Sequence, residues 1–285
     1  MKSGGLYYTK RKVTGHAMMA LSGLMAMGVV SVLFWILGYV FIKGISGIDL
    51  DFFTELPTPV GVPGGGMATA IVGSIIVVGM AGLMAVPVGV ATAVYVSEYG
   101  RGVFAGTVRF VSDVLAGVPA IVAGIVAYAL VVRTMGRFSA FSGSVSLAIL
   151  MLPIIIRSSD EILRTVPDTL REASLALGVP RWRTVLKVVV KTESGGLVTG
   201  IMLAVARVGG EAAPLLFTAF SNSFWSLRPD QPMATLPVQL FNYAISPYED
   251  WHRKAWAAAL LLIFMILMLN IWAKWYARGR MPKQG

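Results

Sequence analysis

The sequence predicts an all-α membrane protein in which six helices cross the bilayer. Of its 285 residues, 56% are hydrophobic and 13% are charged, whereas an ordinary soluble domain has about 45–50% apolar and about 25% charged residues. The apolar residues are gathered into blocks close to the length of ~20 residues that a helix needs to cross the hydrocarbon layer. Because most charged residues lie between these blocks, we expect a polytopic helical protein and not a soluble fold.

The six apolar blocks are predicted to be six membrane-spanning helices, and they group into three parts of the chain. The first block is too long for the apolar region of a signal peptide, which has about 7–15 residues, so we expect it to be retained as a helix. The predicted spans are 17–42, 69–96, 108–132, 141–156, 195–220 and 255–273. The three parts are an N-terminal segment with the first span and an outer loop (1–66), a five-helix core (67–273) and a tail (274–285). Four prolines inside the spans could be packing or kink positions or could take part in transport, and the pattern favours neither: Pro87, Pro119, Pro153 and Pro214.

The basic residues predict how the chain is oriented. With six spans both termini lie on one side, and that side receives 17 of the 24 Lys and Arg residues. Six others fall on the opposite side, and Arg207 lies inside a span. Because loops rich in Lys and Arg stay in the cytoplasm, we expect a protein of the inner or plasma membrane with both termini and the loop 157–193 in the cytoplasm. The net charge of +10 then reflects topology and not nucleic-acid binding.

Several kinds of catalytic and cofactor site are missing from the sequence. No Gly-Lys dipeptide occurs, so the chain has no Walker A loop with which to bind ATP. It has no cysteine and only two histidines, His16 and His252, which the topology keeps apart. We therefore expect no metal site, no resident cofactor and no catalytic triad. The pattern predicts a subunit that catalyses no reaction by itself.

The charged loop contains the start and stop signals of one short helix at 165–180. Thr165 and Asp168 have the spacing of a capping box, and Gly178 followed by Pro180 is typical of a helix end. The helix would carry a narrow stripe of small and apolar residues on a polar surface, formed by Leu170, Ala173, Ser174 and Leu177. Such a helix could lie on the membrane or dock into a cytoplasmic protein, and the pattern alone favours neither.

Two charged residues interrupt the fifth apolar block. Arg207 is 12 positions beyond Gly195, which places it about 18 Å into a hydrocarbon layer of ~30 Å. An arginine at that depth costs about 2.5–3.5 kcal/mol to insert and usually faces an aqueous cavity or a partner. Glu211 follows on the same face of the predicted helix, within reach of a salt bridge.

Two interpretations of this pair remain open. Arg207 and Glu211 could form an ion pair that neutralises both charges and holds two helices together. Alternatively, Arg207 could be an anion-binding site on a transport path. A guanidinium offers two parallel donors to an oxyanion such as phosphate, which lysine cannot match. Glu211 could then accept a hydrogen bond from a protonated oxyanion and disfavour sulfate, which has no proton to donate.

The charged loop resembles the EAA motif of permease subunits of type I ATP-binding-cassette importers. The resemblance is carried by Glu172-Ala173-Ser174, by Gly178 and by Val188-x-Val190, although Val190-Lys191 stands where the motif usually ends in Leu-Pro. Phosphate-importing members of this family are similar to further stretches of the chain, at 170–173, 176–182, 206–219, 221–226, 236–238 and 246–251. The resemblance implies the MetI-like permease fold with six membrane helices.

The resemblance also implies partners. A second, similar permease subunit, two ATPase subunits that bind ATP and magnesium, and a phosphate-binding protein would complete the importer. The binding protein could meet the outer loop 221–254, whose aromatic residues could instead simply anchor the loop at the membrane interface. The helix 165–180 would be the coupling helix, seated in a cleft of an ATPase subunit. The coupling residues would be Leu170, Arg171, Glu172, Ala173, Ser174, Leu177 and Gly178.

The resemblance adds Arg157 to Arg207 and Glu211 on the phosphate path. An arginine at the cytoplasmic end of a span usually anchors topology, but Arg157 lies four residues after Pro153, as in the family pattern. Asp113 is interpreted as a helix-start charge. The predicted function is ATP-driven phosphate import by alternating access. The alternatives are import of another oxyanion or a phosphonate, or an anion channel or transporter that works without ATP.

Overall fold

The computed structural model describes residues 4–62, 64–100 and 102–278, and these residues are almost entirely helical. The helices are α1 (Gly4–Ile45), α2 (Leu50–Thr54), α3 (Ala68–Val94), α4 (Val103–Ala116), α5 (Ala120–Ala127), α6 (Arg133–Met135), α7 (Ala140–Leu163), α8 (Asp168–Ala176), α9 (Arg181–Thr184), α10 (Val190–Thr192), α11 (Ser194–Val208), α12 (Ala213–Leu216), α13 (Leu236–Ala244) and α14 (Glu249–Arg278). Three π-helical turns extend α3, α5 and α9, namely η1 (Tyr95–Tyr99), η2 (Tyr128–Val132) and η3 (Val185–Val189).

Four helical segments are long and apolar enough to cross a membrane by themselves, and two bent helix pairs raise the number of spans to as many as six. The four single spans are Lys10–Ile45, Ala68–Tyr99, Ala140–Leu163 and Glu249–Ala277. The predicted all-helical, multi-span class is confirmed. Each single span is longer than the apolar block that predicted it, because polar residues continue the helix into the interfacial layers on either side of the hydrocarbon.

The third predicted span, 108–132, is not one continuous helix. α4 ends at Ala116, α5 begins at Ala120, and the two segments are bent by 105° at the break. Pro119 explains the break, since proline has no N–H to donate and disfavours a helical conformation in the residue before it. The break lies beside one of the four prolines that the sequence marks as possible kink positions, and the two segments together are long and apolar enough to form one bent span.

The fifth predicted span, 195–220, is shorter than expected. α11 ends at Val208 and is followed by a turn at Gly209 and Gly210, before the short helix α12. Glycine and proline are the weakest helix formers, and Pro214 lies just beyond this turn. The prediction of one helix over this range is wrong. At its other end, α11 is bent by 70° from the helical segment Arg181–Thr192.

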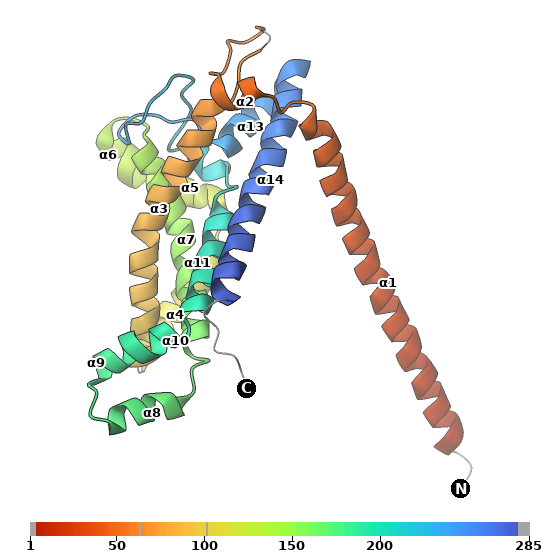
Figure 1. Cartoon of the computed structure of the whole chain (residues 1–285), viewed down its shortest axis with the longest axis vertical. Coiled ribbons are helices and arrows are strands. Elements are labelled where there is room, and N and C mark those ends of the chain that lie inside the picture. The colour runs from red at the N-terminus through yellow and green to blue at the C-terminus, as the bar shows by residue number, and fades with distance from the viewer. Residues whose placement is uncertain (1–3, 63, 101, 279–285) are drawn as a thin grey trace.

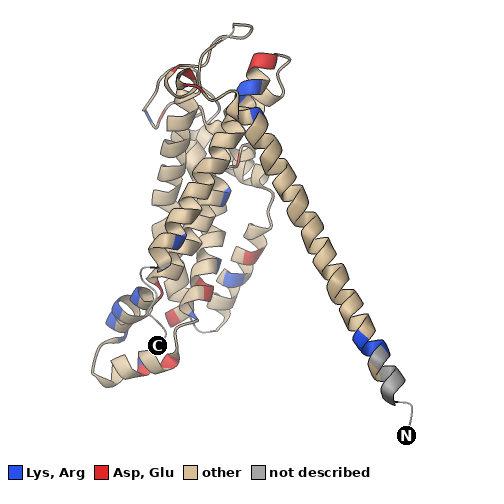
Figure 2. Ribbon diagram, turned by 45° about the vertical axis from the view of Figure 1, so that its right-hand side comes forward, with Lys and Arg blue, Asp and Glu red and all other residues tan. Residues whose placement is uncertain are grey.

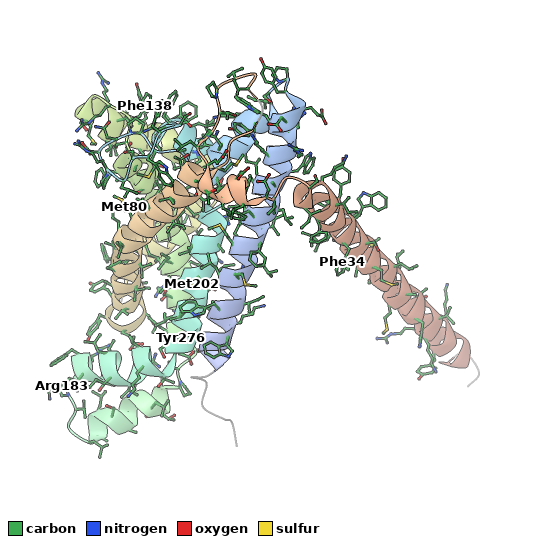
Figure 3. The ribbon with its side chains drawn as sticks, turned by 45° about the horizontal axis from the view of Figure 1, so that its top comes forward. Phe34, Met80, Phe138, Arg183, Met202 and Tyr276 are labelled. Carbon is green, nitrogen blue, oxygen red and sulfur yellow. The ribbon has the colours of Figure 1, made fainter. Side chains whose placement is uncertain are left out.

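The helices α3 and α7 form the centre of a bundle, with α11 and α14 beside them (Figure 1). A Cβ atom added to Gly89 of α3 would lie 2.7 Å from Ile155 of α7, so the missing side chain permits this close packing. α1 meets the bundle only near its C-terminal end, where the rings of Tyr39 and Trp256 pack edge to face at 5.3 Å. The rest of α1 diverges, and its side chains, with Phe34 labelled, project into the surroundings (Figure 3).

The helices α8 to α10 lie at the same end of the molecule as the N-terminal end of α1 and the C-terminal end of α14 (Figure 1). Figure 2 shows Lys and Arg on α9 and near the N-terminal end of α1. The charged loop and the two terminal helices thus share one end, as the six-span topology requires. Residues 274–278 of the predicted tail belong to α14, and residues 279–285 lie outside the described residues. Four basic residues of the orientation count also lie outside them: Lys2, Arg101, Arg280 and Lys283.

Candidate functional site

α8 corresponds to the helix that the sequence predicts at 165–180, but it is shorter, covering only 168–176. The predicted capping box does not form, because the Thr165 hydroxyl donates a hydrogen bond back to the Ile162 carbonyl at 2.7 Å. The predicted stop is confirmed. Gly178 has a φ of +78°, a left-handed conformation that glycine adopts without steric cost at the end of a helix.

The predicted coupling residues differ in how far they are exposed. Ser174 is buried, with its hydroxyl 2.9 Å from the Thr184 hydroxyl of α9. The Arg171 side chain also turns inward and is only 19% exposed. The residues left on the outer surface are Leu170, Glu172, Ala173, Leu177 and Gly178. The predicted stripe is therefore wrong in its inclusion of Ser174, since a hydroxyl that finds a partner inside the chain can be buried.

Arg171 is bound within this chain and does not face outward as a coupling residue would. Its Nε and Nη2 atoms donate to the two carboxylate oxygens of Glu98 at 3.1 and 2.7 Å. Its Nη1 atom donates to Val166 O at 2.5 Å and Asp168 Oδ1 at 3.1 Å, and Nη2 also donates to Leu163 O at 3.1 Å. All five N–H donors of the guanidinium are used. The hydrogen bond to Glu98 is the main cause that raises the pKa of Arg171 above its usual value.

Glu98, which our sequence interpretation missed, connects two loop helices to the end of α3. It lies in η1 and is 8% exposed. Its backbone carbonyl accepts a hydrogen bond from Arg181 of α9, whose guanidinium also lies 5.1 Å from the centre of the Tyr99 ring. One signal was available, because Glu98 is the only acidic residue between Glu55 and Asp113. A lone carboxylate that is buried needs a cationic partner.

Arg157 lies at the α8 end of α7 and binds two carboxylates. Its Nη1 atom is 2.5 Å from Asp113 Oδ1, and its Nε atom is 3.1 Å from Glu161 Oε1. Asp113 lies near the end of α4, so its interpretation as a helix-start charge is wrong. The three side chains are more than half exposed and border a cavity of about 190 Å³. The other lining residues are Arg109, Ser112, Ile156, Asp160 and Arg164.

A buried carboxylate forms the inner wall of this cavity. Asp160 accepts from Arg109 of α4 at 2.8 Å and from Arg164 at 3.2 Å. Arg109 also donates to Val96 O of η1 at 2.8 Å. These contacts tie α4 to both α7 and η1. No local pattern predicts them, because the partners are 51 and 13 positions apart.

Arg207 and Glu211 are not paired in the structure. Arg207 is the next-to-last residue of α11 and is exposed, and Glu211 follows the glycine turn. Neither side chain has a hydrogen bond or ion pair with any residue that the structure describes. The expected pairing on one helical face is wrong, because the helix ends between the two residues. The interpretation in which this ion pair holds two helices together is therefore not supported. None of the N–H donors of Arg207 is used by a described residue.

The comparisons with known proteins define the class of this chain. Residues 85–281 match the family described as binding-protein-dependent transport system inner membrane component, and the chain belongs to that family. It is 44% identical over 243 residues to the phosphate transport system permease protein PstA of Yersinia pestis, covering 85% of this chain and 82% of the relative. It is 40% identical over 265 residues to PstA of Haemophilus influenzae, covering 93% and 94%.

Solved transporter structures share the fold. A chain of the inward-facing MetNI methionine ABC transporter matches with a TM-score of 0.61 at 18% identity, over 76% of this chain and 98% of that chain. A chain of a bacterial alginate ABC transporter matches with a TM-score of 0.63 at 11% identity, over 95% and 96%. These likenesses concern the fold alone, and they confirm the predicted MetI-like fold.

Proposed function

We propose that the chain is the membrane permease subunit of an importer that moves inorganic phosphate into the cell, driven by ATP hydrolysis in separate subunits. The observation that carries this proposal is the 44% identity to PstA over most of the chain. Arg207, which has no partner among the residues that the structure describes, supports it, since a planar guanidinium binds an oxyanion through two parallel hydrogen bonds. An arginine inside an apolar span is also a functional position by default.

The partners of the importer follow from this proposal. They would be a second permease subunit, two ATPase subunits that bind ATP and magnesium, and a phosphate-binding protein on the opposite side, near the outer loop 221–254. α8 lies beyond the ends of the bundle helices (Figure 1), which favours docking into an ATPase over a position along the membrane. Leu177 is 84% exposed and suits burial in a partner's cleft. The end that carries α8 and the two terminal helices would face the cytoplasm.

The path of phosphate would pass both unusual arginines by alternating access. Arg207 would meet the anion inside the membrane, and Arg157 would meet it at the cavity near α8. At Arg157 the anion must compete with Asp113 and Glu161, which already occupy the guanidinium. Such competition keeps the anion from binding too tightly, and a transport path requires sites that release their ion.

Uptake competition tests the substrate. The chain is expressed with its partner subunits in a cell that lacks other phosphate importers, and uptake of radiolabelled phosphate is measured with excess sulfate, molybdate or a phosphonate. We expect only unlabelled phosphate to compete, and uptake to stop when the ATPase is inactivated. Competition by another anion would reassign the substrate. Uptake by the chain alone without ATP would instead support an autonomous anion transporter.

The selectivity role of Glu211 is tested by Glu211→Gln. Removing the carboxylate removes its repulsion of a fully ionised anion, so we expect sulfate transport to rise at least about fivefold while phosphate transport continues. Glu193→Gln is the matched control, because Glu193 is the nearest carboxylate before α11 and lies at its opposite end. Normal phosphate transport with sulfate still rejected would show that Glu211 does not select the substrate.

A further inference from the structure

α8 has few contacts of its own with the membrane bundle. It has nine residues, and Ser174 is the only one that is buried. The Ser174 hydroxyl reaches Thr184 of α9, which belongs to the same loop. The direct connection from α8 to the bundle is made by Arg171, which holds both carboxylate oxygens of Glu98.

The two loop helices converge on Glu98. Its carboxylate holds α8 through Arg171, and its backbone carbonyl holds α9 through Arg181. This carbonyl lies in the last turn of a helix, where it would otherwise have no partner. The turn is π-helical, with the Gly100 N–H bonded to Tyr95 O at 2.7 Å, and such turns are frequent at functional positions. We call Glu98, Arg171 and Arg181 the Glu98 clamp.

Arg171 also ties the end of α7 to the same point. It donates to the carbonyls of Leu163 and Val166, which lead from α7 into α8. The ends of α3 and α7 and the start of α8 therefore share one guanidinium. Since the Glu98 side chain is only 5% exposed, moving α8 away from α3 would leave a buried carboxylate without its counter-charge, which is strongly unfavourable.

We propose that the Glu98 clamp makes α8 and the adjoining end of α3 one rigid lever, so that a displacement of α8 is delivered directly to the centre of the bundle. This proposal rests on the proposed function, since an ATPase partner is what would displace α8. α3 and α7 share the main apolar core of the protein. Without the clamp, α8 moves independently of α3, and ATP is hydrolysed without moving the core helices.

Transport by the reconstituted complex with Glu98→Gln tests the clamp. Glutamine keeps the shape of the side chain and removes its charge. We expect the ATPase subunits to stay bound, hydrolysis to continue, and the phosphate transported per ATP hydrolysed to fall at least about tenfold. Lys187→Gln is the matched control, because Lys187 is an exposed charge of the same loop with no partner among the described residues. An unchanged ratio would overturn the proposal. Loss of the ATPase from the purified complex would also overturn it, since Glu98 would then support docking and not transmission.

Distance measurements test the clamp without reference to the substrate. The chain has no cysteine, so spin labels can be placed at Thr169→Cys on α8 and Val88→Cys on α3, both exposed positions. In the assembled complex we expect one narrow distance distribution that ATP does not change, and a broad one in Glu98→Gln. A broad distribution with the clamp intact would contradict a rigid lever.

A second variant covers the case in which Glu98→Gln does not accumulate in the membrane. Arg171→Lys keeps the charge but loses the two-pronged geometry. We expect it to lower the transport ratio by a smaller factor of about threefold, and an unchanged ratio would count against the clamp. If the parent complex moved no phosphate with ATP, the proposed function would fail, while the label distances would still decide whether the clamp is rigid.

Discussion

Arg171 and Arg207 are the same kind of side chain used in opposite ways. Arg171 gives all five of its donors to this chain and is 19% exposed. Arg207 has no partner among the described residues and is exposed. The first lies in the loop outside the bundle, and the second lies in a helix that belongs to one of the bent spans.

The difference distinguishes an arginine whose donors are used within the chain from one whose donors are free of the described residues. A guanidinium whose donors are all used fixes the segments around it, because any movement breaks charged hydrogen bonds. A guanidinium with no partner keeps its donors for an anion, and in a membrane its insertion cost of about 2.5–3.5 kcal/mol falls only when a partner or water reaches it. We therefore expect Arg171 to govern rigidity and Arg207 to govern substrate passage.

Removing Arg207 is expected to have the largest effect on transport. In Arg207→Gln, phosphate uptake falls about 100-fold, because a hydrogen bond to a charged group contributes up to about 3 kcal/mol, while thermal stability in detergent does not fall. Arg133→Gln is the matched control, since Arg133 is exposed and has no partner among the described residues. Normal uptake by Arg207→Gln would remove this residue from the path.

Removing Arg171 is expected to have the largest effect on stability. In Arg171→Ala, Glu98 stays buried without its counter-charge, which costs about 3 kcal/mol. Hydrogen exchange should speed up across residues 166–192 and the melting temperature should fall. The neighbouring Glu172→Ala is the comparison, because Glu172 is exposed and unpaired within the described chain. Equal exchange in both variants would show that the clamp does not hold the loop.

A smaller effect is expected at the end of α8. Gly178→Ala places a side chain at a φ of +78°, which costs about 1 kcal/mol. The cost is conformational, because no atom lies within 4 Å of the added Cβ. Gly136→Ala is the matched control, with a φ of +69° and the same open space. Both variants should lose similar stability, and only Gly178→Ala should lower the transport per ATP. A loss of coupling in both would point to general destabilisation.

The smallest effect on stability is expected at the exposed pair of Arg157. Asp113→Asn breaks an ion pair whose side chains are 55% and 52% exposed, so the unfolding free energy should change by less than about 1 kcal/mol. Phosphate should then be held longer at Arg157, which lowers the turnover of transport at saturating phosphate. An unchanged turnover would favour the alternative in which Arg157 only anchors topology.

The four single spans were predictable because hydrophobic transfer is a local and additive property of each block. The breaks in the two bent helix pairs were harder to predict, since the four prolines named above all fall inside apolar blocks. Pro87 and Pro153 stay within α3 and α7, while Pro119 lies at a break and Pro214 begins a short helix. Whether a helix continues through proline depends on how neighbouring segments satisfy the freed carbonyls, and a single apolar block does not contain that information.

The candidate site likewise contains residues that local sequence predicts and contacts that it does not. Gly178, Arg207 and the family motif around Glu172 were found from local sequence. The partners of the charged residues were not, because Arg171 and Glu98 are 73 positions apart and Arg157 and Asp113 are 44 apart. The one pair predicted from helical spacing, Arg207 with Glu211, failed because the helix ends between them.

The class of this protein, its apolar spans, the family to which it belongs and the position of its loop helix can all be read from the amino-acid sequence. These follow from transfer free energies and short patterns that each segment carries alone. Which charges are paired within the described residues, and so the contrast between Arg171 and Arg207, follows only from the three-dimensional arrangement of the helices. That contrast depends on distances between segments remote in the chain, since burial and electrostatic pairing act through space and not along the sequence.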